Sequence, residues 1–536
     1  MENKTFEIQP IFSSFLIQKK LNLDTKSIKN WIEKSSHTDY KIPLTFDEDI
    51  LKDFYLSLKE ILDNLHLALG FSKNTKQQFQ EAWVNVDSNE RKNRSKIGKK
   101  VFTESLLNIV ENDVHLTADP LFNFTIGPKH NSGNYRYHAN VRGFRITGDL
   151  GNNISFETRF YENQFLYPDF LKEKSVSRSN PSQGIDGIAF GLGRAKNFED
   201  FGNDASLANG YLSYSPSKYL NFQIGHGRHF FGDGYRSHLM SDYAPDYPYI
   251  SGQYYLFNKK LLYKHVTAWM RNLNRIPAAS TPEALFIPKS TSFNQLSFSP
   301  NAKFSIAVFE GGVYQSYELQ NGNINPDLSF YSPIIGTKLI DIDTVNNIIY
   351  GFNGAYNLFI NLKIYNQIAI KYPFKSYGFQ LGIMWDNPFK IENSFLNFEC
   401  NNSPTSLYSM QEGQQFQSYS HLGHELAHPM GAGFQEFLFR GQLSYKLLFI
   451  RVNYNYAKMI NNYSGNEIFE SLDNQLFNII LDNTRLFLNT NIGVMLNKSS
   501  NMELSLGHLT RIKNNLAENY IFLSWRTYLK NDYFDQ

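Results

Sequence analysis

From about His115 onward, apolar and polar residues alternate over many short segments of the chain. From Tyr377 to Trp385, for example, aromatic and aliphatic residues take every second position, with glutamine or glycine among the residues between them. The same pattern recurs at 437–445, 450–456 and 503–507. A period of two predicts β-strands whose two faces meet different surroundings. Alternation alone also fits a soluble β-sandwich.

The lengths of the connections favour a membrane barrel over a sandwich. Short turns are predicted at 149–153, 215–218, 258–260, 299–302, near 361, 388–393, near 446 and at 498–501. Longer stretches lie between them, at 165–207, 227–251, 272–290, 312–347 and 402–432. Short turns on one side and long loops on the other are typical of outer-membrane barrels, and this arrangement gives about eighteen strands. The sequence therefore predicts an all-β, antiparallel transmembrane β-barrel over 113–536, with both ends of the barrel in the periplasm.

The N-terminal residues have a different, helical pattern. Thr45 and Glu48 form a capping box, and apolar residues then repeat at intervals of three and four until Gly70. A second helix is predicted over Ile97–Val110. We therefore expect an α-rich segment at 1–92 and a helix within 93–112 that leads into the barrel. The first sixteen residues lack the apolar core and cleavage site of an export signal.

Composition supports the barrel and narrows the chemistry. The chain has 33 Tyr and 45 Phe, yet its mean hydropathy is −0.40, as expected when an aromatic outer face and a polar lumen cancel in the average. A formal charge of +2 does not indicate nucleic acid as a partner. The single cysteine, Cys400, excludes an internal disulfide. The chain contains no phosphate-binding loop, dinucleotide fingerprint or serine elbow, so we expect no cofactor and no enzymatic activity.

A glycine-rich segment follows the strand that begins at Tyr219. Because 215–218 is a short turn, this strand runs outward, and the segment at 225–250 lies at the external mouth or folds back into the lumen. Its polar and aromatic side chains suit sugar hydroxyls and ring faces. The candidate polysaccharide-binding residues are Arg228, Asp233, Tyr235, Arg236, Asp242, Tyr243 and Tyr247. The alternative is an inward-folded loop that bonds to lumen side chains and braces the barrel.

A zinc-peptidase motif, H-E-x-x-H, occurs at His424, Glu425 and His428. Its chemistry requires both histidines on one face of a continuous helix, with the glutamate as base. Pro429 follows at once, which argues against a helix that continues there. We therefore expect no metal at this motif and interpret its histidines as hydrogen-bonding groups of an external loop.

Several separated strings resemble one known family. The string GHGRHFFGDGYRS at 225–237, followed by LMSDYAPDYPYI at 239–250, resembles the Wzi-type capsule assembly family of outer-membrane β-barrels, in the RemB-like form of gliding bacteria. Further similar strings are DVHLTADPLFNFTIG at 113–127, the hairpin at 141–170, LAHPMGAGFQEFL at 426–438 and YIFLSWRTYLKNDYF at 520–534. They occur in the family's order across the predicted barrel.

The resemblance implies a lectin-like, non-catalytic role at the bacterial outer membrane. The work implied is attachment of surface polysaccharide or assembly of a capsule, with surface polysaccharide and outer-membrane lipid as partners and a link to gliding motility. Family members begin with an export signal, so residues 1–92 are interpreted as a fused or foreign segment. A porin-like solute channel is the alternative function, and a zinc metallopeptidase is the third.

Overall fold

The computed structural model describes the chain from Ser95 to Asp535. Within this range, the description leaves gaps at 112, 130–135, 152, 172–187, 190, 199–201, 258–259, 276–285, 302, 319–320, 340–346, 360, 373–375, 409–416, 460–482, 498–499, 514–515 and 528–532. The predicted α-rich segment at 1–92 lies outside the described residues.

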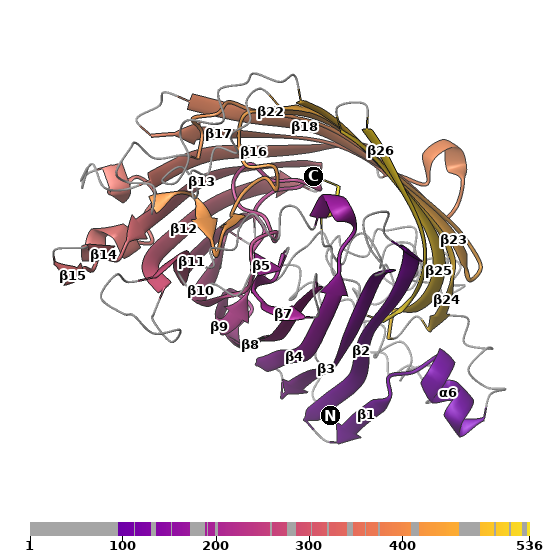
Figure 1. Ribbon diagram of the computed structural model, residues 1–536. Coiled ribbons are helices and arrows are strands. Elements are labelled where there is room, and N and C mark those ends of the chain that lie inside the picture. The colour runs from indigo at the N-terminus through magenta and orange to yellow at the C-terminus, as the bar shows by residue number, and fades with distance from the viewer. Residues whose placement is uncertain are drawn as a thin grey trace.

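The described residues form a closed antiparallel barrel of 18 strands (Figure 1). In chain order, its strands are β2 (Val114–Lys129), β3 (Arg136–Leu150), β4 (Ile154–Leu166), β8 (Gly202–Ser217), β9 (Leu220–Gly227), β10 (Tyr247–Leu256), β11 (Leu261–Arg275), β12 (Phe286–Asn301), β13 (Phe304–Gln315), β16 (Asn347–Phe359), β17 (Leu362–Lys371), β18 (Ser376–Asp386), β19 (Ser394–Ser403), β22 (Phe434–Tyr445), β23 (Leu448–Met459), β24 (Asn483–Asn497), β25 (Met502–Lys513) and β26 (Leu516–Arg526). The barrel closes where β26 pairs with β2, from Asn123 opposite Arg526 to Ile126 opposite Leu523. The predicted architecture and strand number are confirmed.

The connections follow the predicted arrangement with two differences. All eight predicted short turns join consecutive strands, and each of the five predicted long stretches contains a longer connection, but the long connection at 460–482, between β23 and β24, was not predicted. On the loop side, however, β17 and β18 are joined only by 372–375, and β25 and β26 only by 514–515. The contrast between the two rims is therefore less regular than the sequence predicts.

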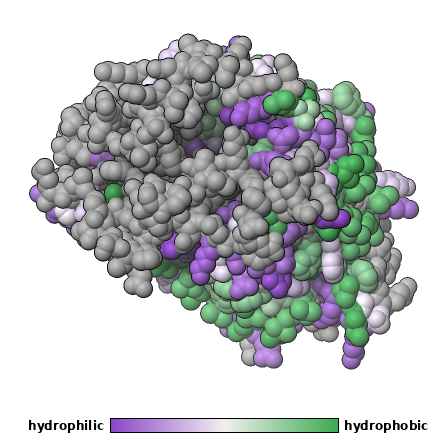
Figure 2. Space-filling view, in the orientation of Figure 1, coloured by the Kyte–Doolittle hydropathy of each residue, from purple (hydrophilic) through white to green (hydrophobic). Residues whose placement is uncertain are grey.

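The two faces of the wall differ as the alternation predicts. On β22, Phe437 and Tyr445 point outward and are exposed, whereas Glu436 and Leu438 point inward and are buried. The same outward exposure of large apolar side chains recurs around the wall, at Phe144, Phe160, Leu212, Ile224, Ile250, Phe379, Leu381, Phe398, Leu443, Ile492, Leu506, Ile521 and Trp525. In Figure 2, green hydrophobic residues accordingly line the right and lower edges of the barrel, and purple hydrophilic residues gather towards the middle of the view.

The helix before the barrel is shorter than predicted. Helix α6 spans Lys96–Phe102, with Ser95 accepting a hydrogen bond from the backbone of Gly98 at its N-terminus. Leu107–Glu111 forms strand β1, which pairs with the first residues of β2, so the predicted helix over Ile97–Val110 is wrong in its second half. The apolar residues there occupy the edge of a strand, and pairing with β2 overrides their helical spacing. No helix in the described part of the chain is long and apolar enough to cross a bilayer.

The lumen is filled by chain rather than left open. Residues 228–246, between β9 and β10, fold inward, and so do the described residues of 404–433, which include β20 (Ser420–His421) and β21 (His424–Glu425). The C-terminal end also lies inside the ring of strands (Figure 1). Apolar residues of these segments pack against wall residues in two large buried clusters. The predicted polar lumen therefore also contains a packed apolar core.

Candidate functional site: the plug in the barrel lumen

Residues 228–246, here called the plug loop, form a compact unit stabilised from within. Phe231 and Met240 form an isolated antiparallel bridge. The Ser237 hydroxyl donates to the Phe231 carbonyl at 2.6 Å and accepts from the backbone amides of Leu239 and Met240 at 3.1 and 3.2 Å. These local bonds satisfy the backbone of a loop that no longer faces water.

The plug loop docks directly on the barrel wall at Gly234. A Cβ placed there would lie 2.6 Å from Gln380 Oε1 on β18 and 2.7 Å from Glu399 Oε1 on β19, so a side chain at this position would displace the ends of both wall side chains. The backbone amides of Tyr235 and Arg236 both donate to the Glu399 carboxylate. One wall carboxylate thus holds the tip of the plug loop through its main chain.

Arg236 is the central charge of the site. Its Nη2 lies 2.9 Å from Glu436 Oε1 on β22 and 3.1 Å from Asp535 Oδ1 in the C-terminal tail, and its side chain has no exposed surface. Burial opposes its charge, but the carboxylates of Asp535 and Glu436 hold the pKa of Arg236 well above its usual value. The guanidinium also lies over the rings of Tyr235 and Tyr533. Arg236 therefore joins the plug loop, the wall and the tail in one ion-pair network.

Two buried histidines extend this network. His428 Nε2 lies 2.8 Å from Glu436 Oε2, its Nδ1 accepts from the Met430 amide at 3.2 Å, and its ring lies 5.5 Å from that of His238. Burial lowers the pKa of His238 to about 3. Burial also lowers the pKa of His428, although the contact between His428 and Glu436 acts in the opposite direction. A neutral His238 beside the network is consistent with this burial.

Arg228 stabilises the base of the plug loop. Its Nε donates to Asp246 Oδ1 at 2.8 Å, its Nη1 to the Asp242 carbonyl at 3.0 Å and its Nη2 to the Gly191 carbonyl at 3.0 Å. Because Arg228 and Asp246 stand at the two ends of the plug loop, this ion pair closes the loop at its base. A buried guanidinium with several directed contacts of this kind favours one geometry.

The seven candidate polysaccharide-binding residues lie together, with protein partners. Arg228, Tyr235, Arg236, Asp242, Tyr243 and Tyr247 are all at most 7% exposed, whereas Asp233 is half-buried. Asp242 accepts from the Tyr533 hydroxyl, Tyr243 packs edge-on against Tyr533, and the Tyr247 hydroxyl accepts from the His229 amide at 3.0 Å. Asp233 accepts from Asn353 Nδ2 at 2.8 Å and lies 3.5 Å from Lys363 Nζ. These contacts are those expected of an inward-folded loop that bonds to lumen side chains and braces the barrel. Binding of polysaccharide by the seven residues remains a prediction.

The zinc-type motif does not form a helix. His424 and Glu425 make up the short strand β21, and His428 lies three residues beyond it, just before a turn. His424 Nε2 accepts from the Gly191 amide at 2.9 Å, whereas His428 contacts Glu436. Among the described residues, no group of three or more metal-ligating side chains is arranged to hold an ion. The two histidines serve as hydrogen-bonding groups, and they do so inside the barrel rather than in an external loop.

Several members of the network were not predicted from the sequence. Glu399 and Glu436 are wall residues, and only the strand alternation marks them as inward-facing. Asp535 and Tyr533 lie beyond the last strand, where a polar and aromatic tail, NDYFDQ, gives a weak signal. His238 lies among the glycine-rich residues, where its type alone indicates no role. Their roles come from contacts between segments up to 300 residues apart, such as Tyr235 with Asp535.

Comparisons with known proteins give neighbours of low similarity. No protein-family model matches the chain, and no curated protein matches it. Among solved structures, Wzi of Escherichia coli, an outer-membrane protein involved in group 1 capsule assembly and a carbohydrate-binding β-barrel, is 14% identical over 77% of this chain and 84% of its own, with a TM-score of 0.49. Pseudomonas aeruginosa OprD is 11% identical over 80% and 97%, with a TM-score of 0.41, and OccK8 (OprE) of the same bacterium 8% identical over 77% and 98%, with a TM-score of 0.43.

Proposed function

We propose that this protein is a bacterial outer-membrane barrel that attaches or assembles surface polysaccharide without catalysis, rather than a channel for solutes. The outward band of aromatic and aliphatic side chains supports placement in a membrane, because such a surface is unfavourable in water. The ordered set of motifs similar to the capsule assembly family supports the polysaccharide role and its link to gliding motility.

The observation that carries the proposal is the filled lumen. A solute channel needs a continuous aqueous path, whereas here Arg236, Glu436 and His428 meet across the lumen with no exposed side-chain surface. Withdrawing the plug loop would separate these ion pairs and expose the apolar residues that it packs against the wall, so the closed state is energetically favoured. A plug that stays in place is compatible with a protein that binds polysaccharide at its external surface and does not need to conduct solutes.

We propose that the seven candidate residues contribute to polysaccharide attachment by fixing the conformation of the plug loop. Their polar groups bond to the wall, the tail and one another, so we propose that they position the external surface that meets the polysaccharide. Asp233, whose side chain is 13% exposed, is the most exposed of the seven, and we propose it for direct contact.

Loss of the gene in the source bacterium tests the proposal. Polysaccharide should then be released into the medium in place of being retained on cells, and the wild-type gene should restore retention. A double variant, Arg236→Ala with Arg228→Ala, should restore retention poorly despite normal amounts of barrel in the outer membrane. Unchanged retention in the deletion strain would reject the polysaccharide role.

A further inference from the structure

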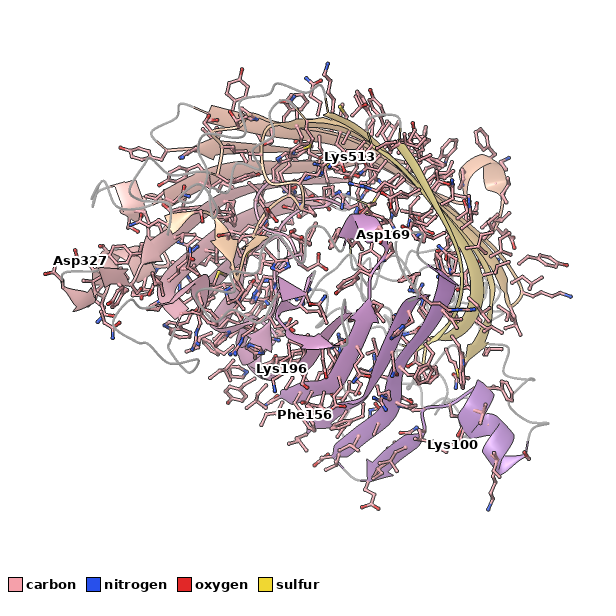
Figure 3. All side chains as sticks on the ribbon, viewed as in Figure 1. Lys100, Phe156, Asp169, Lys196, Asp327 and Lys513 are labelled. Carbon is pink, nitrogen blue, oxygen red and sulfur yellow. The ribbon has the colours of Figure 1, made fainter. Side chains whose placement is uncertain are left out.

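The segment between β13 and β16 lies against the outside of the barrel wall. Val308, Glu310 and Gly312 point outward from β13; Val308 is exposed, but Glu310 is completely buried. Glu310 is covered by η3 (Leu328–Tyr331) and η4 (Thr337–Leu339), from which Lys338 Nζ reaches Glu310 Oε2 at 3.0 Å. Figure 3 places Asp327, at the start of η3, at the far left edge, away from the lumen. This covering segment, 327–338, is thus part of the outer surface.

Beside the covering segment, the outer wall contains a shallow cavity of about 540 Å³ that is open to the outside. Its lining includes Phe222 of β9, Ile250 and Gly252 of β10, Thr267 and Trp269 of β11, and Tyr331 of η3. Gly252 pairs with Phe222 on one side and His265 on the other, and the Tyr254 ring folds over it, with its hydroxyl 2.9 Å from where a Cβ would stand. A volume of this size lies in the range of small-ligand sites.

The chemistry of the cavity favours hydrocarbon over a charged group. Phe222, Ile250 and Trp269 are 41%, 50% and 44% exposed, so the cavity is continuous with the apolar outer face. The imidazole of its lining already has protein partners. His265 Nδ1 lies 2.6 Å from Asn294 Oδ1 and its Nε2 3.0 Å from Thr267 Oγ1, while the nearby Lys338 is paired with Glu310. A carboxylate or phosphate would therefore find no free cation among the described residues that line the cavity.

We propose that this cavity binds one acyl chain of a bilayer lipid and holds it against the barrel. The proposal rests on the membrane placement proposed above. On the covering segment, Leu328 and Ile334 are 89% and 65% exposed and extend the apolar surface around the cavity. A lipid chain is the occupant that such a surface meets in a membrane, and each buried methylene adds to retention.

Lipid retention by the full chain tests the proposal. The protein is purified in detergent, stripped of lipid and incubated with phosphatidylethanolamine, and retained molecules are counted by native mass spectrometry. The wild type should retain one lipid more tightly than the rest. Thr267→Phe, which fills the cavity, should weaken that retention about tenfold. Thr158→Phe, at an exposed outward position on β4, is the matched control and should retain lipid as the wild type does.

The possible failures are distinguishable. Equal retention by the wild type and both variants would overturn the proposal, as would tight retention of free palmitate in place of the lipid. If Thr267→Phe does not fold, Tyr331→Ala removes the cavity's cover from the covering segment and should lower retention in the same assay. A chain that stays soluble without detergent would reject the membrane placement itself, whereas a detergent-requiring barrel without site-dependent retention would reject only the lipid site.

Discussion

Replacing Arg236 by alanine should increase local opening of the plug loop without unfolding the barrel. The substitution leaves Glu436 and Asp535 buried beside each other without their shared cation. Removing one partner of a buried ion pair is destabilising by about 3–5 kcal/mol. Because Glu436 keeps its bonds from Asn401 and His428 at 2.8 Å each, we expect the lower end, about 3 kcal/mol, which corresponds to about a 100-fold change in an equilibrium constant.

Hydrogen exchange in detergent measures this opening locally. Amides in peptides covering 228–246 should exchange about 100-fold faster in Arg236→Ala than in the wild type, while wall peptides keep their protection. Arg145→Ala is the control for a general loss of a lumen arginine, since the Arg145 Nη2 lies 4.0 Å from Asp119 on the wall and the ion pair does not involve the plug loop, so exchange at 228–246 should stay close to the wild-type rate. Unchanged exchange of the plug loop in Arg236→Ala would refute the reasoning that the ion-pair network stabilises it.

Three further outcomes follow from the same structure. Burial lowers the pKa of His238 to about 3, so its contribution to plug stability is complete above the unfolded value of about 6.5 and is lost as the pH falls towards 3. Once exchange rates are divided by the intrinsic rate at each pH, the opening equilibrium of the plug loop should rise about 30-fold from pH 8 to pH 5, and less in His238→Phe. Gly234→Ala should loosen the plug loop in the same assay, whereas Gly441→Ala, whose nearest neighbour lies at 3.2 Å, should not. Phe437→Arg, on the outer face, should lower the barrel's unfolding free energy in lipid by about 2–4 kcal/mol, whereas the inward Asn489→Arg should have little effect; equal losses would contradict the assignment of faces.

The barrel itself could be predicted from the sequence because its physics is local. Alternation along a strand depends only on neighbouring residues, and the turns at 151–153 or 446–447 are marked by a few residues each. For this reason, alternation alone assigns Phe437 and Glu436 to opposite faces of the wall. The helix over Ile97–Val110 failed for the complementary reason, since pairing of β1 with β2 depends on a partner strand that local spacing does not reveal.

The interior of the lumen could not be predicted in the same way. Composition marks the plug loop as ordered, and an inward brace was one of two interpretations of it. Which wall residues meet it depends on strand register around the whole barrel. Glu436 and Asp535, the two ion-pair partners of Arg236, lie 200 and 299 residues after it in the chain. A single sequence gives no indication of pairs so far apart.

The central claim, a closed membrane barrel whose lumen is filled by its own chain, is tested most directly by conductance across a planar lipid bilayer. The purified full-length protein should insert yet give no steady open channel at neutral pH, because the plug loop and its ion pairs occupy the lumen. Large, stable, wild-type channels under these conditions would contradict it.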